Sequence, residues 1–591
     1  MADVEYRVEY RIGLEERNAH LVQVEARFAA GGGDVDLKLP VWTPGSYLVR
    51  EFERHVQDVA CTSPDGAPLP VRKLDKSTWR VDARGAESVV ARYRVYANDL
   101  TVRSAHFDDT HAFLNGACLF LYVDSLAGAE ARVTVEPPRG WSVTVALPEP
   151  KPNTFVACSY DELVDSPFEI GTHELVEFRA QGKPHRLAIW GRAAIDRATL
   201  TADIIKIIDA AAALFGDGVP YDDYTFLLML APNQYGGLEH ARSCALLSSP
   251  FTFHPRKKYE EFLELVAHEF FHLWNVKRIH PEALGPFDYQ REAYTRSLWV
   301  MEGVTSYYDR YLLVRAGLQK PEQYLEKLAE ELSKIAAIPG RKRQSLEESS
   351  FDAWIKLYRP DENSVNSTIS YYLKGGAVAL LLDLEIRQRT GGKRTMDDVM
   401  RLLWIRFGKE GKGFADQNVQ SLVEEAAGLE LGPFFDRHVR GRDEVDAERL
   451  LGTVGLTLTA GAEEDEEGGE SKREPWLGVT TREDGDALVV ATAVEGGPAV
   501  AAGLYANDQL LALDGFRIDS ATLKDRLAAR RPGDKVAFTL FRRDELRLVE
   551  VTLAEKPVEK LTIAPAPAAT AAEKAAYEAW LGAPWKSAEE E

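Results

Sequence analysis

Two histidines and a glutamate interrupt a short apolar stretch in the middle of the chain. His268 and His272 are four residues apart, Glu269 lies between them, and their neighbours are mostly phenylalanine, leucine and valine. On an α-helix the two imidazoles lie about one turn apart on the same face, so both can bind one metal ion. The apolar neighbours predict a buried helix, in which unpartnered polar side chains are unfavourable. The spacing therefore predicts a zinc-binding helix, with Glu269 as a candidate general base.

A catalytic zinc site needs a third protein ligand and leaves its fourth position to water. The next helix-compatible stretch, 297–309, contains Glu302 in its apolar first part, and we predict Glu302 as the third ligand. Asp309 follows about two turns later on the same face. It is a candidate to accept the spare ring N–H of a ligand histidine, which would fix the tautomer of that ring.

Four motifs occur in a fixed order along the chain. They are Gly-Gly-Leu-Glu-His at 236–240, His-Glu-Phe-Phe-His at 268–272, Trp-x-x-Glu-Gly-x-Thr-x-Tyr-Tyr at 299–308 and Tyr-Tyr-x-Lys-Gly at 371–375. This order resembles the glycyl aminopeptidase family, which are gluzincin zinc metallopeptidases with a PDZ domain, distantly related to aminopeptidase N. The resemblance covers nearly the whole chain. It implies a zinc-dependent aminopeptidase with one Zn²⁺ per chain that hydrolyses N-terminal residues, glycine or alanine in the family, from peptides.

The resemblance also implies how the substrate is held. Glu239 is expected to bind the free α-amino group of the peptide. Gly236 and Gly237 precede it and would let the backbone approach the substrate closely. His240 stands where aminopeptidase N has an asparagine, and its role stays open.

Two neighbouring tyrosines are candidates for the residue that donates a hydrogen bond to the oxyanion. By its place in Tyr-x-Lys-Gly, Tyr372 corresponds to the residue that donates a hydrogen bond to the oxyanion, and Tyr371 is the rival. In the resulting mechanism the zinc ion activates a water, Glu269 takes its proton, and zinc and Tyr372 stabilise the oxyanion. The alternatives are a zinc endopeptidase, which would not need Glu239, and a non-catalytic PDZ scaffold.

Composition limits the other classes of function. The 591 residues are 45% hydrophobic and 10% aromatic, as expected for several globular domains, and the formal charge of −22 argues against nucleic acid as a partner. No run is apolar enough to span a membrane, and the first residues do not resemble a signal peptide, so we expect a cytoplasmic protein. The four cysteines are too scattered for a disulfide framework, and we interpret them as reduced core thiols.

The patterns predict a multidomain fold. Short alternating runs predict an N-terminal all-β sandwich over 1–170, followed over 171–450 by a thermolysin-like α/β catalytic domain with a helical bundle. An acidic linker is predicted at 451–474, a β-rich PDZ domain at 475–556 and a Pro/Ala-rich tail with a short helix at 557–591. The PDZ domain would bind a C-terminal peptide through backbone N–H groups near Leu477 and Gly478. The Trp-Thr-Pro-Gly-Ser-Tyr loop at 42–47 either faces the active site or is a rigid loop packed by aromatics, the interpretation we favour.

Overall fold

The computed structural model describes residues 7–461, 474–557 and 560–587. The chain forms two compact units. The first comprises the described residues of Met1–Thr295, Tyr308–Leu318 and Met400–Asp416, and the second comprises those of Arg296–Tyr307, Gln319–Val399 and Gln417–Glu591.

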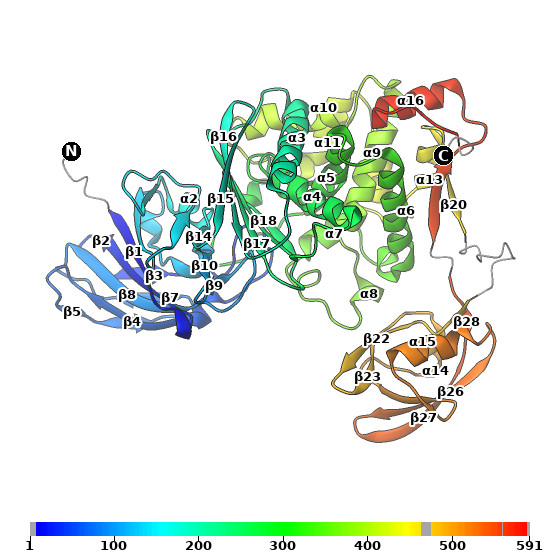
Figure 1. Ribbon diagram of the computed structural model, residues 1–591, viewed down its shortest axis with the longest axis horizontal. Helices are drawn as coiled ribbons and strands as arrows, with labels where there is room; N and C mark the ends of the chain where they lie inside the picture. The colour runs from blue at the N-terminus through cyan, green and yellow to red at the C-terminus, as the bar shows by residue number, and fades with distance from the viewer. Residues whose placement is uncertain (1–6, 462–473, 558–559, 588–591) are drawn as a thin grey trace. The chain divides into compact units, whose positions relative to one another are not determined.

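The N-terminal part of the first unit is built from three sheets (Figure 1). The largest has seven strands in the order β13 (Thr154–Ala157), β11 (Ala131–Glu136), β1 (Val8–Glu16), β2 (Leu21–Ala29), β8 (Ser88–Tyr96), β4 (Val56–Thr62) and β5 (Pro68–Leu69). The second has the order β12 (Ser142–Thr144), β14 (Phe168–Gly171), β10 (His111–Leu114) and β9 (Ala105–Phe107). The third has the order β3 (Val35–Lys38), β7 (Thr78–Val81) and β6 (Val71–Lys73).

These sheets share one hydrophobic core, as the alternating sequence pattern predicts. In β1 the residues Val8, Tyr10, Ile12 and Leu14 are buried, while the residues between them are partly or fully exposed. Side chains of a strand point to opposite faces in turn, so this alternation places one face of β1 on the core. The N-terminal β-rich fold is therefore confirmed.

A five-stranded sheet follows in the same unit. Its order is β15 (Glu174–Ala180), β16 (Lys183–Trp190), β17 (Tyr224–Leu230), β19 (Ser243–Ser248) and β18 (Gly236–Glu239). Helix α3 (Arg197–Phe215) connects β16 to β17, and these two strands are parallel. Strand β18 pairs antiparallel with β19 and ends the sheet. Helix α4 (Arg256–Phe271) packs against both β18 and β19, so the sheet edge and the histidine helix are neighbours.

Helices dominate the next part of the chain, which lies mostly in the second unit. A π-helical turn at Trp299–Gly303, here called η5, continues directly into α5 (Val304–Arg315). The helices that follow along the chain are α6 (Pro321–Ala337), α7 (Leu346–Phe351), α8 (Ser364–Ser367), α9 (Leu373–Thr390), α10 (Met396–Leu403), α11 (Val419–Ala427), α12 (Gly432–His438) and α13 (Ala447–Gly452). Helix α9 runs without a break through Lys374, Gly375 and Gly376, although glycine disfavours the interior of a helix.

A β-rich domain follows with its own small core. Its main sheet has the order β22 (Val479–Asp484), β23 (Ala487–Ala493), β24 (Gln509–Leu513), β26 (Lys535–Arg542) and β27 (Glu545–Thr552), with β25 (Phe516–Arg517) paired to β24. Two short helices, α14 (Pro498–Ala502) and α15 (Ser520–Ala528), accompany it, and β21 (Pro475–Trp476) pairs with β28 (Ala554–Glu555).

The segments on either side of this domain are more ordered than their composition indicates. Strand β20 (Leu456–Ala460) pairs antiparallel with β29 (Leu561–Pro565), so part of the predicted linker and part of the predicted tail form a two-stranded ladder. The tail helix is α16 (Ala571–Leu581). Most of the acidic run of the linker, 462–473, lies outside the described residues.

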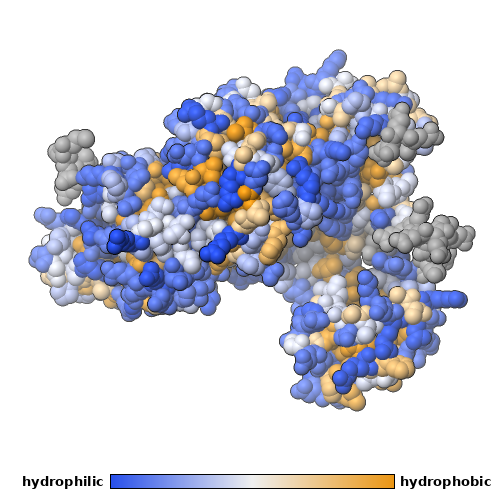
Figure 2. All heavy atoms as spheres, in the orientation of Figure 1, coloured by the Kyte–Doolittle hydropathy of each residue, from blue (hydrophilic) through white to orange (hydrophobic). Residues whose placement is uncertain are grey.

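One cysteine corrects the sequence interpretation. Cys61, Cys118 and Cys244 are buried, but Cys158 is exposed and is not a core thiol. Among the described residues, no helix has the length and hydropathy that a membrane span requires. In Figure 2 hydrophilic side chains cover much of the visible face.

Candidate active site

Helix α4 carries the two histidines because its sequence is amphipathic. Phe262, Val266 and Phe270 recur at intervals of four residues and are almost fully buried. The helix ends at Phe271, and His272 follows as its C-cap with helical dihedral angles. His268 and His272 therefore stay one turn apart, with ring centroids 4.6 Å from each other. This is the arrangement that the spacing predicts.

Both imidazoles are oriented by hydrogen bonds on the same ring nitrogen. His268 Nδ1 lies 3.0 Å from Asp309 Oδ2, and His272 Nδ1 lies 2.6 Å from the backbone oxygen of Asn275. A carboxylate or a carbonyl accepts from an N–H, so both Nδ1 atoms carry the proton, and Nε2 is the ring nitrogen whose lone pair can bind a metal ion. The sequence singled out Asp309 for such a role. The sequence could not indicate the role of Asn275, because the acceptor is its backbone carbonyl, which every residue has.

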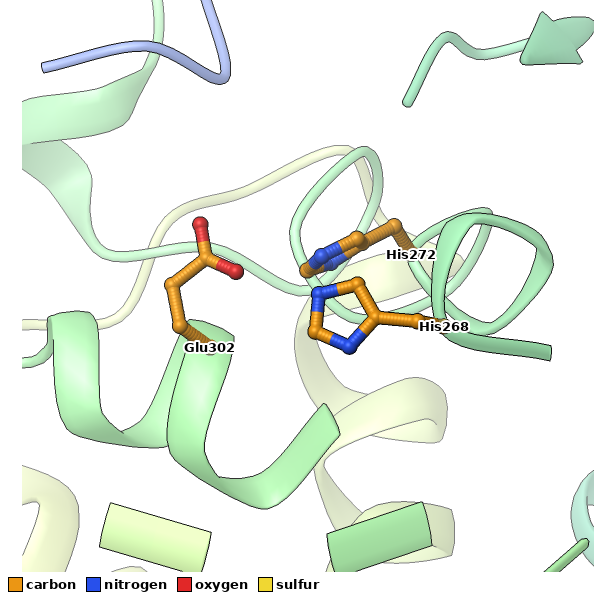
Figure 3. A group of neighbouring side chains, drawn as sticks. All are labelled: His268, His272 and Glu302. Carbon is orange, nitrogen blue, oxygen red and sulfur yellow. The ribbon is translucent and has the colours of Figure 1, made fainter. Parts of the chain in front are cut away.

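Glu302 completes the group of possible metal ligands. One ligand atom each from His268, His272 and Glu302 lies within 4.8 Å of the others (Figure 3). In Figure 3 the two rings point from one helix toward the Glu302 carboxylate on another. Glu302 lies in η5, which continues into the α5 segment that carries Asp309. Two imidazole nitrogens and one carboxylate form a donor set of the catalytic zinc type, so these residues fit that ion.

The candidate general base lies against the sheet edge. Glu269 is 5% exposed, and a methyl group placed on Gly237 would be only 2.0 Å from Glu269 Oε1. Only a glycine leaves room for the carboxylate at this position. The missing side chain of Gly237 thus accommodates Glu269. That Gly237 also lets a substrate approach the backbone stays a prediction.

Glu239 lies at the end of the same strand. One of its carboxylate oxygens lies within 4.8 Å of ligand atoms of both Glu269 and His272, and its side chain is buried. Gly237 and Glu239 are two residues apart in β18, so they share the face of the strand that meets α4. The fold thus brings the Glu239 carboxylate close to Glu269 and His272. That Glu239 binds the substrate α-amino group stays a prediction.

The loop at 42–47 also reaches Glu239. A methyl group on Gly45 would lie 2.6 Å from Glu239 Oε1 and 2.7 Å from Oε2, and the φ of Gly45 is +82°. Both facts require glycine. Trp42 and Tyr47 in the same loop are buried, so the favoured interpretation of a loop packed by aromatics holds for them. The loop nevertheless forms one wall around the Glu239 carboxylate, which was the alternative interpretation.

His240 belongs to a buried ion-pair network that the sequence did not indicate. Its Nδ1 lies 3.1 Å from Asp165 Oδ1, and the same oxygen accepts from Lys277 Nζ at 2.6 Å. The backbone N–H of Ala241 donates to Asp165 Oδ2. Burial opposes ionisation of Asp165, but Lys277 and His240 outweigh it and lower the pKa of this carboxyl to about 2. The network fixes the chain directly after Glu239.

The two candidate tyrosines differ in environment. Tyr371 is fully buried and stacks on Tyr372, whose ring centroid is 4.8 Å away. Tyr372 is half-buried, and its hydroxyl lies 3.0 Å from that of Tyr358, a residue the sequence analysis did not single out. Burial, and then the charge of nearby Glu302, raise the pKa of the Tyr372 phenol well above its usual value. It therefore stays protonated and able to donate at neutral pH.

Close packing of glycines holds these residues together in the second unit. A methyl group on Gly303, directly after Glu302, would lie 2.7 Å from the backbone of Gly375 and 2.8 Å from the Tyr371 oxygen. Helix α9 therefore crosses η5 at backbone distance. This crossing explains why the chain has glycine at both positions.

The two residues predicted for the PDZ ligand lie at the start of that domain. Leu477 is buried in its core, and Gly478 has a φ of +77°. Their carbonyl oxygens accept from Ala499 N at 3.0 Å and from Val494 N at 2.8 Å. The loop is thereby fixed to the rest of the domain, directly before β22.

Comparison with known proteins supports this picture. Three family models match the chain: the peptidase M61 N-terminal domain at residues 9–172, the M61 glycyl aminopeptidase at 261–378 and a PDZ domain at 475–553. The crystal structure of an aminopeptidase N family protein from Idiomarina loihiensis is 34% identical, with a TM-score of 0.90. The match covers 97% of this chain and 100% of that one.

More distant likeness extends to an M1 zinc metallopeptidase from Deinococcus radiodurans. That structure is 13% identical with a TM-score of 0.46, and the match covers 74% of this chain and 93% of that one. No curated protein matches the sequence significantly. The family models, together with the match along almost the whole chain at 34% identity, establish the family. The chain belongs to the M61 glycyl aminopeptidase family of metallopeptidases.

Proposed function

We propose that this peptidase is a zinc-dependent aminopeptidase that removes one residue at a time from the N-terminus. The observation that carries the proposal is the environment of Glu239. The residue is 4% exposed, and within the described chain no lysine or arginine forms an ion pair with its carboxylate. A buried charge without a counterion is unfavourable, and a substrate ammonium would supply that counterion. An internal stretch of peptide would leave the carboxylate unpaired, which disfavours endopeptidase activity.

His268, His272 and Glu302 would hold one zinc ion. When bound, zinc supplies Lewis-acid chemistry, which polarises a carbonyl and lowers the pKa of a bound water toward about 7. Asp309 and the Asn275 carbonyl keep both imidazoles in the tautomer that this role needs.

Three residues around the proposed metal ligands would transfer the proton, stabilise the oxyanion and position the substrate. Glu269 takes a proton from the attacking water and later delivers it to the leaving amine. Tyr372 donates a hydrogen bond to the carbonyl oxygen as negative charge develops there. Glu239 binds the substrate ammonium and so sets which peptide bond meets Glu269. The matched family is described as a glycyl aminopeptidase, which favours glycine as the released residue. Alanine, which the sequence resemblance also implies, is the alternative.

The PDZ domain would bind the C-terminus of a peptide. Strand β22 stands at one end of its sheet and pairs with β23 alone, while α15 packs close to it. An extended peptide adds to an open strand edge of this kind. The loop at Leu477 and Gly478, directly before β22, would bind the terminal carboxylate through its backbone N–H groups.

Substitution Glu269→Gln tests the proposed chemistry. It keeps the size of the side chain and removes the base, so the variant should retain zinc but lose turnover of a free-amine peptide by about a hundredfold or more. Glu261→Gln, about two turns earlier on α4, is the matched control and should be close to wild type. Zinc content and kcat are measured together for all three proteins. A Glu269→Gln protein with normal kcat would exclude Glu269 as the base.

A further inference from the structure

An arginine from the N-terminal part of the first unit lies at the open edge of β18. Arg103 Nη2 donates to the backbone oxygen of Gly237 at 3.3 Å, and a methyl group on Gly236 would lie 3.5 Å from Nη1. Strand β18 pairs with β19 on one side only. The guanidinium therefore lies beside the glycines where an added peptide strand would run.

The backbone of Arg103 is held firmly. The neighbouring side chain of Val102 is fully buried in a cluster that also contains Leu238 of β18. The Arg103 N–H donates to Thr101 Oγ1 at 3.2 Å, and its carbonyl accepts from Cys118 Sγ at 3.7 Å. The backbone that carries the guanidinium is thus fixed next to β18.

The charge of Arg103 has no counterion within the described chain. No carboxylate there forms an ion pair with it, and its buried Nε has no hydrogen-bond acceptor. Other cations in this unit are paired, Lys277 with Asp165 and Arg242 with Asp223. A guanidinium presents a planar fork of donors that matches a carboxylate. An anionic group of a ligand would supply the counterion that Arg103 lacks among the described residues.

The distance between Arg103 and Glu239 along the strand sets the size of that ligand. Arg103 contacts Gly236 and Gly237, which are three and two residues before Glu239. At about 3.3 Å per residue this is a span of roughly 7–10 Å, about the length of two or three residues of an extended peptide. A peptide that pairs antiparallel with β18 and has its ammonium at Glu239 directs its other end toward Arg103.

We propose that Arg103 binds the C-terminal carboxylate of a dipeptide or tripeptide substrate, so that the enzyme recognises both charged ends of a short peptide. This inference rests on the proposed function, because it takes the ammonium at Glu239 as its starting point. The substrate class is then short zwitterionic peptides, with the anionic end held by Arg103 and the cationic end by Glu239.

Trialanine and trialanine amide, which differ only in the terminal charge, test the proposal. Wild type should have a kcat/KM about ten- to a hundredfold higher for the acid than for the amide, since a hydrogen bond to a charged group has about this effect. In Arg103→Gln this preference should fall close to one, and Arg103→Lys should restore part of it. Arg186→Gln is the control, because Arg186 also donates to a carbonyl, that of Val145 at 3.0 Å, but lies in β16. It should keep the preference.

Two results would overturn the inference. One is a wild-type enzyme that does not distinguish acid from amide. The other is an Arg103→Gln variant that loses activity equally on both substrates, which would show that Arg103 only supports the Gly237 carbonyl. N-acetyl trialanine amide separates this failure from failure of the proposed function. Rejection of the acetylated peptide with no acid preference refutes the role of Arg103 alone, whereas its cleavage at the rate of the free amine refutes the aminopeptidase.

Discussion

Gly237 lies so close to Glu269 that a methyl group on the glycine would be 2.0 Å from the carboxylate oxygen Oε1. The edge of the five-stranded sheet and the histidine helix therefore approach each other at this one position without an intervening side chain. The position of Glu269 on α4 therefore depends on the residue type at position 237, which lies in β18.

Substitution Gly237→Ala should displace the Glu269 carboxylate and lower kcat by about a hundredfold, which is at the lower end of the effect of a general base. Overpacking at a buried contact should also destabilise the fold by about 1–3 kcal/mol. Gly236→Ala is the matched control, because its methyl group would meet Arg103 Nη1 at an ordinary contact distance of 3.5 Å. Kinetics and thermal unfolding of both variants check this. Equal kcat values for the two variants would contradict it.

Tyr372→Phe should lower kcat by about 10²–10³ with little change in KM, because it removes one donor to the oxyanion. Tyr371→Phe should have a mild effect, since Tyr371 is fully buried and stacks beneath Tyr372. Tyr358→Phe should be intermediate, because it removes only the hydroxyl 3.0 Å from that of Tyr372. Steady-state kinetics of the three variants rank them. If Tyr371→Phe instead lost the most kcat, the oxyanion donor would be Tyr371 and not Tyr372.

Asp165→Asn should lower the free energy of unfolding by about 2 kcal/mol at neutral pH and leave Lys277 without its anion. The folded-state pKa of Asp165, about 2, is below its ordinary value of 3.8. Its contribution to stability is therefore present above pH 3.8 and is lost as the pH falls toward 2. Denaturant unfolding of both proteins from pH 7 to pH 2 measures the difference. A difference that widens toward acid pH would refute the assigned ion pair.

The local part of the site was predictable from the sequence. His268, Glu269 and His272 lie within one helical turn, so the helical period alone determines how they face each other. Glu302 and Asp309 follow the same logic on the next helix. For such residues, the spacing in the sequence nearly determines the arrangement in space.

The contacts that shape the substrate end of the site were not predictable in this way. Asp165 and His240 are 75 positions apart, and Asp165 and Lys277 are 112 positions apart. Their pairing depends on how the sheets and helices pack, and no motif marks it. The contact of Gly45 with Glu239 is similar, because a glycine carries no side chain that would reveal a neighbour.

The central claim is that Glu239 recognises a free N-terminal ammonium, and hydrolysis of a free peptide and its N-acetylated form tests it most directly. Wild type should cleave the free peptide with a kcat/KM about ten- to a hundredfold higher, and Glu239→Gln should lose most of this preference. As the pH rises past about 8 the substrate amine loses its proton. Wild-type kcat/KM should therefore fall there more steeply than that of Glu239→Gln. Wild-type cleavage of the acetylated peptide as fast as the free one would contradict the account and identify an endopeptidase.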